Sequence, residues 1–255
     1  MVEVKSAAEV DAMRAAGRVV AAALAAVLER AAVGVPLREL DSVARDVLAE
    51  AGARSTFLGY QPRFAPVPFP AVLCTSVNDA ALHGIPTAYR LRDGDVLSVD
   101  FGAELDGWAA DAAQTVIVGT ARPEDARLVE ATRAGLDAGI AAARPGNRVG
   151  DMSAAIGAVA RAAGYGVNTD FGGHGIGRRM HEEPSVPNDG RRGRGLPLRP
   201  GLVVAIEPWF LAGGRSGYRI DEDGWTLRSA DGSRAAHQEH TVAITPDGPR
   251  VLTLL

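Results

Sequence analysis

Hydrophobic positions recur at helical spacing in the first part of the chain. Ser6 followed by Glu9 has the form of a capping box, which predicts a helix from there to about Arg30. A second helix is predicted after Pro36, with Gly52 placed to end it. Its apolar stripe consists of Leu37, Leu40, Val43, Ala44, Val47 and Leu48.

Two patterns of this first part return downstream. The stretch 34–52 resembles 146–164, at an offset of 112 residues from Gly34 to Gly146. A Gly turn that leads into a β-branched strand ending in a carboxylate occurs at 91–100 and again at 198–207, at an offset of 107 residues. A further strand is predicted after each copy, at 115–118 and 241–244.

Together with the predicted helices, the repeat predicts an α/β (α+β) fold of two pseudo-symmetric halves. A pseudo-two-fold axis would bring Asp100 and Glu207, the acids that end the repeated strands, towards a shared centre. The alternative interpretation is that this turn-and-strand pattern is generic and recurs by chance. Burying unpaired carboxylates costs several kcal/mol, so we expect something at the centre to compensate their charge.

Composition narrows the class of protein. The 255 residues are 47% hydrophobic and contain no linker or low-complexity block, so we expect a single domain over 1–255. A net charge of −4 argues against DNA as a partner. The lone Cys74 fits a reducing compartment, and the apolar run 19–28 is too short to span a membrane. We therefore expect a cytoplasmic protein without membrane contact.

Five polar residues are candidates for metal binding. They are Asp100, Asp111, His174, Glu207 and Glu239. Such an oxygen-rich set suits Mn, Fe(II), Co or Zn, and carboxylates can bridge two ions about 3.5 to 4 Å apart. Any one acid alone would more often be a turn residue or half of a salt bridge. The Asp106-Gly107 hairpin signal between Asp100 and Asp111 favours neighbouring antiparallel strands for these two acids.

His174 and His181 lie seven residues apart in a segment that contains several Gly and Pro residues. His181 begins no HExxH helix, because residue 185 is Ser and Pro184 would disrupt the helix. The glycines around His174 lack the order of a dinucleotide loop. The segments 173–177 and 181–184 together are instead similar to the core signature of methionine aminopeptidases. The resemblance extends over the segments 74–78, 83–86, 95–100, 106–111, 201–208, 223–226 and 238–241.

This resemblance implies the pita-bread fold, with an antiparallel sheet and helices outside. It also implies a dinuclear hydrolase that removes initiator methionine from nascent chains. It implies that Asp100 binds one metal ion and that His174 and Glu207 bind the other. Asp111 and Glu239 would bridge both ions, and a metal-bridging hydroxide would be the nucleophile. The catalytic residues would be His83 on the scissile amide nitrogen, His181 on its carbonyl oxygen, and Glu207 as proton shuttle. Tyr60, Cys74, Met180 and Trp225 would line the methionine pocket, although core packing is their alternative. His237 and His240 are interpreted as supporting residues.

Departures from the family pattern gather near this pocket. They are Met180 in place of an aromatic residue, Gln61 after Tyr60, and Ala109 and Ala110 before Asp111. The Pro-rich segment 63–70 is longer than usual, either as a pocket rim or as a surface loop. The chain also contains a local set of arginines, at positions 178, 179, 191, 192 and 194. We interpret this set either as a site of transient ribosome contact or as part of a solvated loop.

Two rival functions remain. An Xaa-Pro aminopeptidase or dipeptidase shares the fold and ligands but usually carries a large N-terminal domain. A non-catalytic pita-bread binding protein typically loses ligands, whereas all five are present here. The short interval from His181 to Glu207 resembles type I enzymes. We therefore expect a type I methionine aminopeptidase that favours a small second residue and acts as a monomer.

Overall fold

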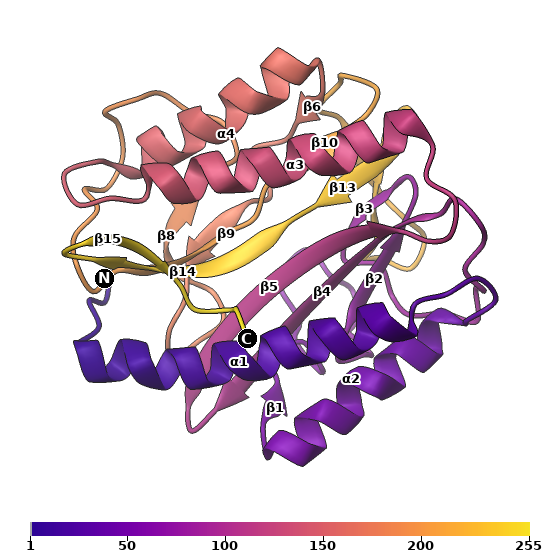
Figure 1. Ribbon diagram of the computed structural model, residues 1–255, viewed down its shortest axis with the longest axis horizontal. Coiled ribbons are helices and arrows are strands. Elements are labelled where there is room, and N and C mark those ends of the chain that lie inside the picture. The colour runs from indigo at the N-terminus through magenta and orange to yellow at the C-terminus, as the bar shows by residue number, and fades with distance from the viewer. Residues whose placement is uncertain (1) are drawn as a thin grey trace.

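The computed structural model describes residues 2–255, which form four α-helices and fifteen β-strands (Figure 1). The helices are α1 (Ala7–Arg30), α2 (Leu37–Ala51), α3 (Pro123–Ala142) and α4 (Val149–Ala163). The strands are β1 (Arg54–Ser55), β2 (Cys74–Val77), β3 (Ala80–Leu82), β4 (Val96–Leu105), β5 (Trp108–Ile117), β6 (Gly166–Val167), β7 (Gly173–Gly175), β8 (Glu182–Val186), β9 (Val203–Ile206), β10 (Trp209–Leu211), β11 (Tyr218–Ile220), β12 (Leu227–Ser229), β13 (Ala235–His237), β14 (Glu239–Thr245) and β15 (Gly248–Val251).

A large sheet with antiparallel pairing forms the middle of the molecule. Its order is β1-β4-β5-β14-β9-β7-β8, with β2 also pairing with β4 and β15 with β14. The central pair is β5 and β14, and the repeat-related strands β4 and β9 lie on either side of that pair. Two small sheets, β13-β10-β6 and β11-β12-β3, complete the strands of the described chain. The expected symmetric order is therefore observed.

The four helices divide between the two halves of the sheet (Figure 1). Helices α1 and α2 pack on β4 and β5 in one hydrophobic cluster, which includes Val20, Leu40 and Val99. Helices α3 and α4 pack on β9 and β14 in a second cluster, which includes Ile156 and Val204. Each half thus buries the apolar side of its own strands under its own helix pair.

The internal repeat is confirmed in local structure. Both α2 and α4 end at a glycine in the left-handed region, Gly52 with φ 62° and Gly164 with φ 75°. Isolated bridges join Pro36 to Arg90 in one half and Arg148 to Pro197 in the other. These bridged residues are related by the same offsets of 112 and 107 that the sequence shows.

Three local predictions are also confirmed. The Ser6 side chain and the Glu9 carboxylate form the expected capping box at the start of α1. The apolar run 19–28 lies inside this helix, and among residues 2–255 no helix is long and apolar enough to cross a bilayer. Asp106 and Gly107 take φ values of 51° and 76°, which form the tight turn between β4 and β5.

Candidate functional site

A row of paired residues crosses the middle of the large sheet. Cys74 on β2 pairs with Asp100 on β4, Asp100 pairs with Ala113 on β5, and Ala113 pairs with Glu239 on β14. Glu207 directly follows β9, the strand that pairs with the other side of β14. Paired residues project to the same face of a sheet, so register brings these acids together. Ala113 adds only a methyl group between Asp100 and Glu239.

Asp111 joins the same face from β5. Its partner on β4 is Gly102, two residues along from the Asp100 pair. A Cβ at Gly102 would lie 2.2 Å from Thr56 Oγ1 and 3.3 Å from Asp111 Oδ1, so a side chain here would clash with Thr56 and crowd the acid. The Thr241 hydroxyl accepts a hydrogen bond from the Asp111 backbone N–H at 2.9 Å and donates one to its carbonyl at 2.8 Å.

His174 lies on the short strand β7 between two glycines. A Cβ at Gly173 would come within 2.2 Å of the Ala205 carbonyl oxygen, and one at Gly175 within 2.1 Å of the Glu183 carbonyl oxygen, so these glycines allow close strand packing. His174 Nδ1 lies 2.9 Å from the Gly175 carbonyl oxygen, which fixes the ring. Its Nε2 then lies 3.5 Å from Glu207 Oε1.

The donor atoms of this cluster fit divalent cations. One ligand atom each from Asp111, His174 and Glu239 lie within 4.8 Å of one another, and all three residues are buried. Among residues 2–255, buried oxygens of Asp100, Asp111 and Glu239 lack any hydrogen-bond partner. Buried polar atoms are rarely left unpartnered. Convergent unpartnered carboxylate oxygens beside an imidazole are the donor set of an oxygen-rich metal centre.

The raised pKa values of the four carboxylates support this interpretation. Burial, followed by the charge of Asp111, raises the pKa of Glu207 to about 8. Burial raises the pKa of Asp111 to about 7, and burial with acidic neighbours raises the pKa of Asp100 and Glu239 well above the usual range. Low dielectric and like charges both disfavour the anionic form. A cation among them would reverse both effects.

Of the two further histidines, His237 lies next to this cluster. His237 Nε2 lies 3.8 Å from Glu207 Oε2 and 4.0 Å from Glu239 Oε2. Burial lowers the His237 pKa to about 3, so its ring is neutral near pH 7. His240 Nδ1 lies 2.8 Å from Thr253 Oγ1. His237 therefore borders two carboxylates of the site, whereas His240, the next residue after Glu239 on β14, projects to the other face of the sheet and bonds there.

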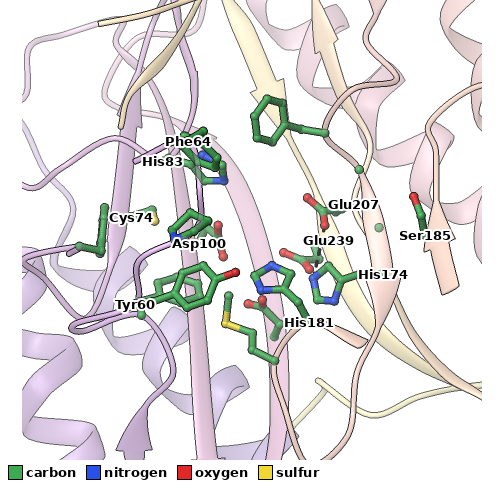
Figure 2. A pocket seen from close by; sticks show the side chains of 18 of the residues that line it. Tyr60, Phe64, Cys74, His83, Asp100, His174, His181, Ser185, Glu207 and Glu239 are labelled. Atoms are coloured by element: carbon green, nitrogen blue, oxygen red, sulfur yellow. Dashed lines mark ion pairs between the residues drawn. The ribbon is translucent and has the colours of Figure 1, made fainter. Parts of the chain in front are cut away.

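The four carboxylates and His174 line a cavity of about 320 Å³ (Figure 2). It contains every residue predicted for catalysis, metal binding or the methionine pocket: Tyr60, Cys74, His83, Asp100, Asp111, His174, Met180, His181, Glu207, Trp225 and Glu239. The structure thus brings together residues spread over most of the chain.

Sequence reasoning missed several aromatic residues of the cavity wall. They are Phe57, Phe64, Phe69 and Phe171. Phe64 and Phe69 belong to the Pro-rich segment 63–70, which is therefore a pocket rim and not only a surface loop. Aromatic residues between prolines were the available signal, but nothing local shows which way their rings point.

The two cavity histidines 83 and 181 each stack against an aromatic ring. The Tyr60 ring lies 5.2 Å from that of His181, and the Phe64 ring lies 6.1 Å from that of His83 (Figure 2). Burial lowers the pKa of His83 to about 4. Burial, with the nearby rings of His174 and His83, lowers the pKa of His181 to about 3. Both imidazoles are therefore neutral near pH 7.

Some of the noted departures lie away from the cavity. Ala109 and Ala110 pack in hydrophobic clusters, and Gln61 bonds within its own segment to the Ala65 carbonyl. Met180 does line the cavity.

The predicted arginine set contacts different elements. Arg178 lies over the Trp108 ring at 3.6 Å, whereas the carbonyls of Arg191 and Arg194 pack on Gly150 at the start of α4. Nothing in these contacts joins the arginines into one basic surface.

Comparison with known proteins agrees with this site. Residues 11–246 match metallopeptidase family M24. The chain is 51% identical to methionine aminopeptidase 1 of Mycobacterium tuberculosis, covering 98% of this chain and 94% of that protein. It is 45% identical to the methionine aminopeptidase of Aquifex aeolicus, covering 100% and 99% of the two chains.

Solved structures show the same relationship. The crystal structure of methionine aminopeptidase from Thermotoga maritima has a TM-score of 0.95 at 36% identity and covers 100% of both chains. The prolidase of Pyrococcus furiosus, with a TM-score of 0.77 at 21% identity, shares the fold, and the match covers 65% of its chain. The antiparallel sheet with its outer helices is thus the expected pita-bread fold, and the chain belongs to the methionine aminopeptidases of metallopeptidase family M24.

Proposed function

We propose that the chain, as one domain over 1–255, removes the N-terminal methionine from nascent proteins. The observation that carries this proposal is the convergence of four carboxylates and His174 at one cavity, beside a wall of thioether, thiol and aromatic side chains. Free N-termini fit this arrangement, because a metal centre can hold the α-amine of the first residue. The relatives named methionine aminopeptidases support the same substrate.

The proposed centre holds two divalent ions drawn from Mn, Fe(II), Co and Zn. Asp100 would bind one ion, His174 and Glu207 the other, and Asp111 and Glu239 both. When bound, such ions activate a water molecule and polarise the carbonyl of the scissile bond. The unpartnered oxygens of Asp100, Asp111 and Glu239 support this assignment among the described residues.

Three side chains of the cavity are assigned to the reaction. Glu207 takes a proton from the attacking water on its carboxylate and delivers it to the leaving amine, as a general base and then a general acid within the cavity. His181 donates a hydrogen bond from its neutral ring to the carbonyl oxygen as negative charge develops there. His83 binds the scissile amide nitrogen.

The methionine side chain would occupy the pocket of Tyr60, Cys74, Met180 and Trp225. Cys74 and Trp225 are buried, and Trp225 donates its indole N–H away to the Val67 carbonyl at 2.9 Å. Burial, then the charge of Asp100, raises the pKa of the Cys74 thiol, so it remains an uncharged, polarisable group. Such a wall suits an unbranched thioether.

The cellular setting remains a prediction from sequence. We propose that the protein acts in the cytoplasm as a monomer on nascent chains with a small second residue. A transient ribosome contact would have to use separate arginines, since Arg178 and the 191–194 segment pack on different elements.

Cleavage of three peptides tests the activity. Chelator-stripped protein is assayed on Met-Ala-Ser, Met-Val-Lys and Ala-Pro-Ala with and without Mn, Co or Fe(II). We expect metal-restored release of methionine, fastest from Met-Ala-Ser, with two ions bound per chain by calorimetry. Preference for Ala-Pro-Ala would assign the chain to the proline-directed relatives instead. No cleavage by folded protein with any metal would refute the proposed activity.

A further inference from the structure

The Pro-rich rim is a closed loop attached to the rest of the cavity. Backbone hydrogen bonds from Gly59 N to Phe69 O at 2.9 Å and from Phe69 N to Tyr60 O at 2.8 Å close its base. Its far side is held by the Trp225 indole, which donates to the Val67 carbonyl. Prolines along the loop restrict its backbone further. The loop is therefore held both at its base and at its far side.

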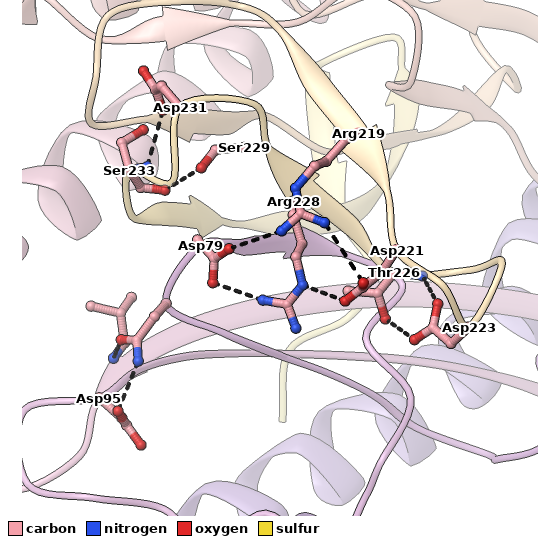
Figure 3. Close-up of polar contacts among 12 residues, drawn as sticks. Asp79, Asp95, Arg219, Asp221, Asp223, Thr226, Arg228, Ser229, Asp231 and Ser233 are labelled. Carbon is pink, nitrogen blue, oxygen red and sulfur yellow. Dashed lines mark hydrogen bonds and ion pairs between the residues drawn. The ribbon is translucent and has the colours of Figure 1, made fainter.

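The turn that carries Trp225 is itself well fixed (Figure 3). The Asp223 carboxylate accepts hydrogen bonds from the backbone N–H groups of Trp225 and Thr226, both at 2.8 Å. Arg228 on β12 forms an ion pair with Asp221, which braces the hairpin below the turn. Anchoring the loop on Trp225 thus ties it to a rigid part of the structure.

This anchored loop places Phe64 against His83. The two rings are nearly parallel, with an interplanar angle of 17° and a centroid distance of 6.1 Å. The Phe64 ring also meets Phe171 and Trp225 edge to face, at 5.5 Å and 5.6 Å. Phe64 nevertheless remains 38% exposed. One part of a large apolar ring is therefore packed, and another faces open space beside the cavity.

We propose that Phe64, with Phe171, forms the wall that limits the side chain of the substrate's second residue. This inference rests on the proposed function, in which His83 binds the scissile amide nitrogen. That nitrogen belongs to the second residue and is bonded to its Cα. A ring stacked on His83 therefore lies next to the side chain that is attached to this Cα. A small side chain would cover the exposed part of the Phe64 ring, whereas a large one would collide with it.

The test compares second residues in matched peptides. Values of kcat/KM are measured on Met-Ala-Ser and Met-Leu-Ser for the metal-loaded wild type and for Phe64→Ala. We expect the ratio of Leu to Ala peptide to rise about tenfold in Phe64→Ala, since even one methylene group in a hydrophobic pocket changes discrimination by roughly 10- to 200-fold. Phe64→Tyr, which keeps the ring, should retain the wild-type ratio.

Val67→Ala is the matched control. Val67 belongs to the same loop, is 51% exposed, and contacts Trp225 through its backbone carbonyl. Its variant should leave the ratio unchanged. An unaltered ratio in folded Phe64→Ala, or an equal loss on both peptides, would overturn the inference, because the ring would then only support His83. Failure of the proposed function is distinct, since wild type would then not cleave Met-Ala-Ser.

Discussion

Lys5 Nζ and Glu182 Oε2 form a buried ion pair of 2.8 Å between segments 177 residues apart. Glu182 directly follows His181, and its carboxylate also accepts the backbone N–H of Arg179. On the other side, the Lys5 backbone N–H donates to the Gly201 carbonyl. The segment before α1 thus holds the turn that carries a cavity histidine.

Replacing Lys5 with Met should destabilise the fold and slow the reaction. Removing one partner of a buried pair leaves the other charge uncompensated, which costs about 3 to 5 kcal/mol. We expect such a loss in the free energy of unfolding by urea, and a lower kcat because the His181 turn loses its support. Asp11→Ala, which removes an exposed pair with Arg250, should cost less than about 1 kcal/mol. Equal losses in both variants would contradict the assignment.

Metal binding should stabilise the protein more at high pH than at low pH. Burial raises the pKa of Asp111 to about 7 and of Glu207 to about 8, above the unfolded values of about 4. Because the folded pKa is the higher one, the metal-free fold is favoured below about pH 4 and loses this stability as pH rises towards 8. The Tm gain on adding Mn should therefore be larger at pH 8 than at pH 5. A constant gain would argue against ions among these carboxylates.

The neighbouring rings of His174 and His181, with centroids 4.3 Å apart, should have separable roles. His174→Ala should lower the number or affinity of bound ions in calorimetry, since an imidazole ligand is lost. His181→Ala should keep both ions while kcat falls by about 10² to 10³, the range for removing one donor to a developing oxyanion. Loss of metal from His181→Ala would contradict this division.

The buried Thr241 hydroxyl should contribute to the stability of the fold. Thr241→Val keeps the shape but removes both hydrogen bonds to the Asp111 backbone. Unsatisfied buried groups cost about 1 to 3 kcal/mol each, so unfolding in urea should show a loss of this order. Thr245→Val, near the end of the same strand, serves as the control. Thr241→Val with wild-type stability would mean that the strands shift to pair these groups elsewhere.

The sequence by itself was enough for features that depend on neighbouring residues. The capping box at Ser6, the left-handed glycines that end α2 and α4, and the Asp106-Gly107 turn are determined by local backbone geometry. The repeat offsets predicted the symmetric halves, because equal patterns fold into equal units. The quoted motifs indicated the family and the residues that now line one cavity.

Only the tertiary structure decided how distant segments meet. The row from Asp100 through Ala113 to Glu239 depends on strand register, and register is set by the packing of the whole sheet. The Phe64 ring lies on His83 because Trp225, far along the chain, holds the loop. Such contacts are set by the burial and hydrogen bonding of groups that lie far apart in the sequence. No local sequence pattern identifies these pairs, so only the folded structure shows them.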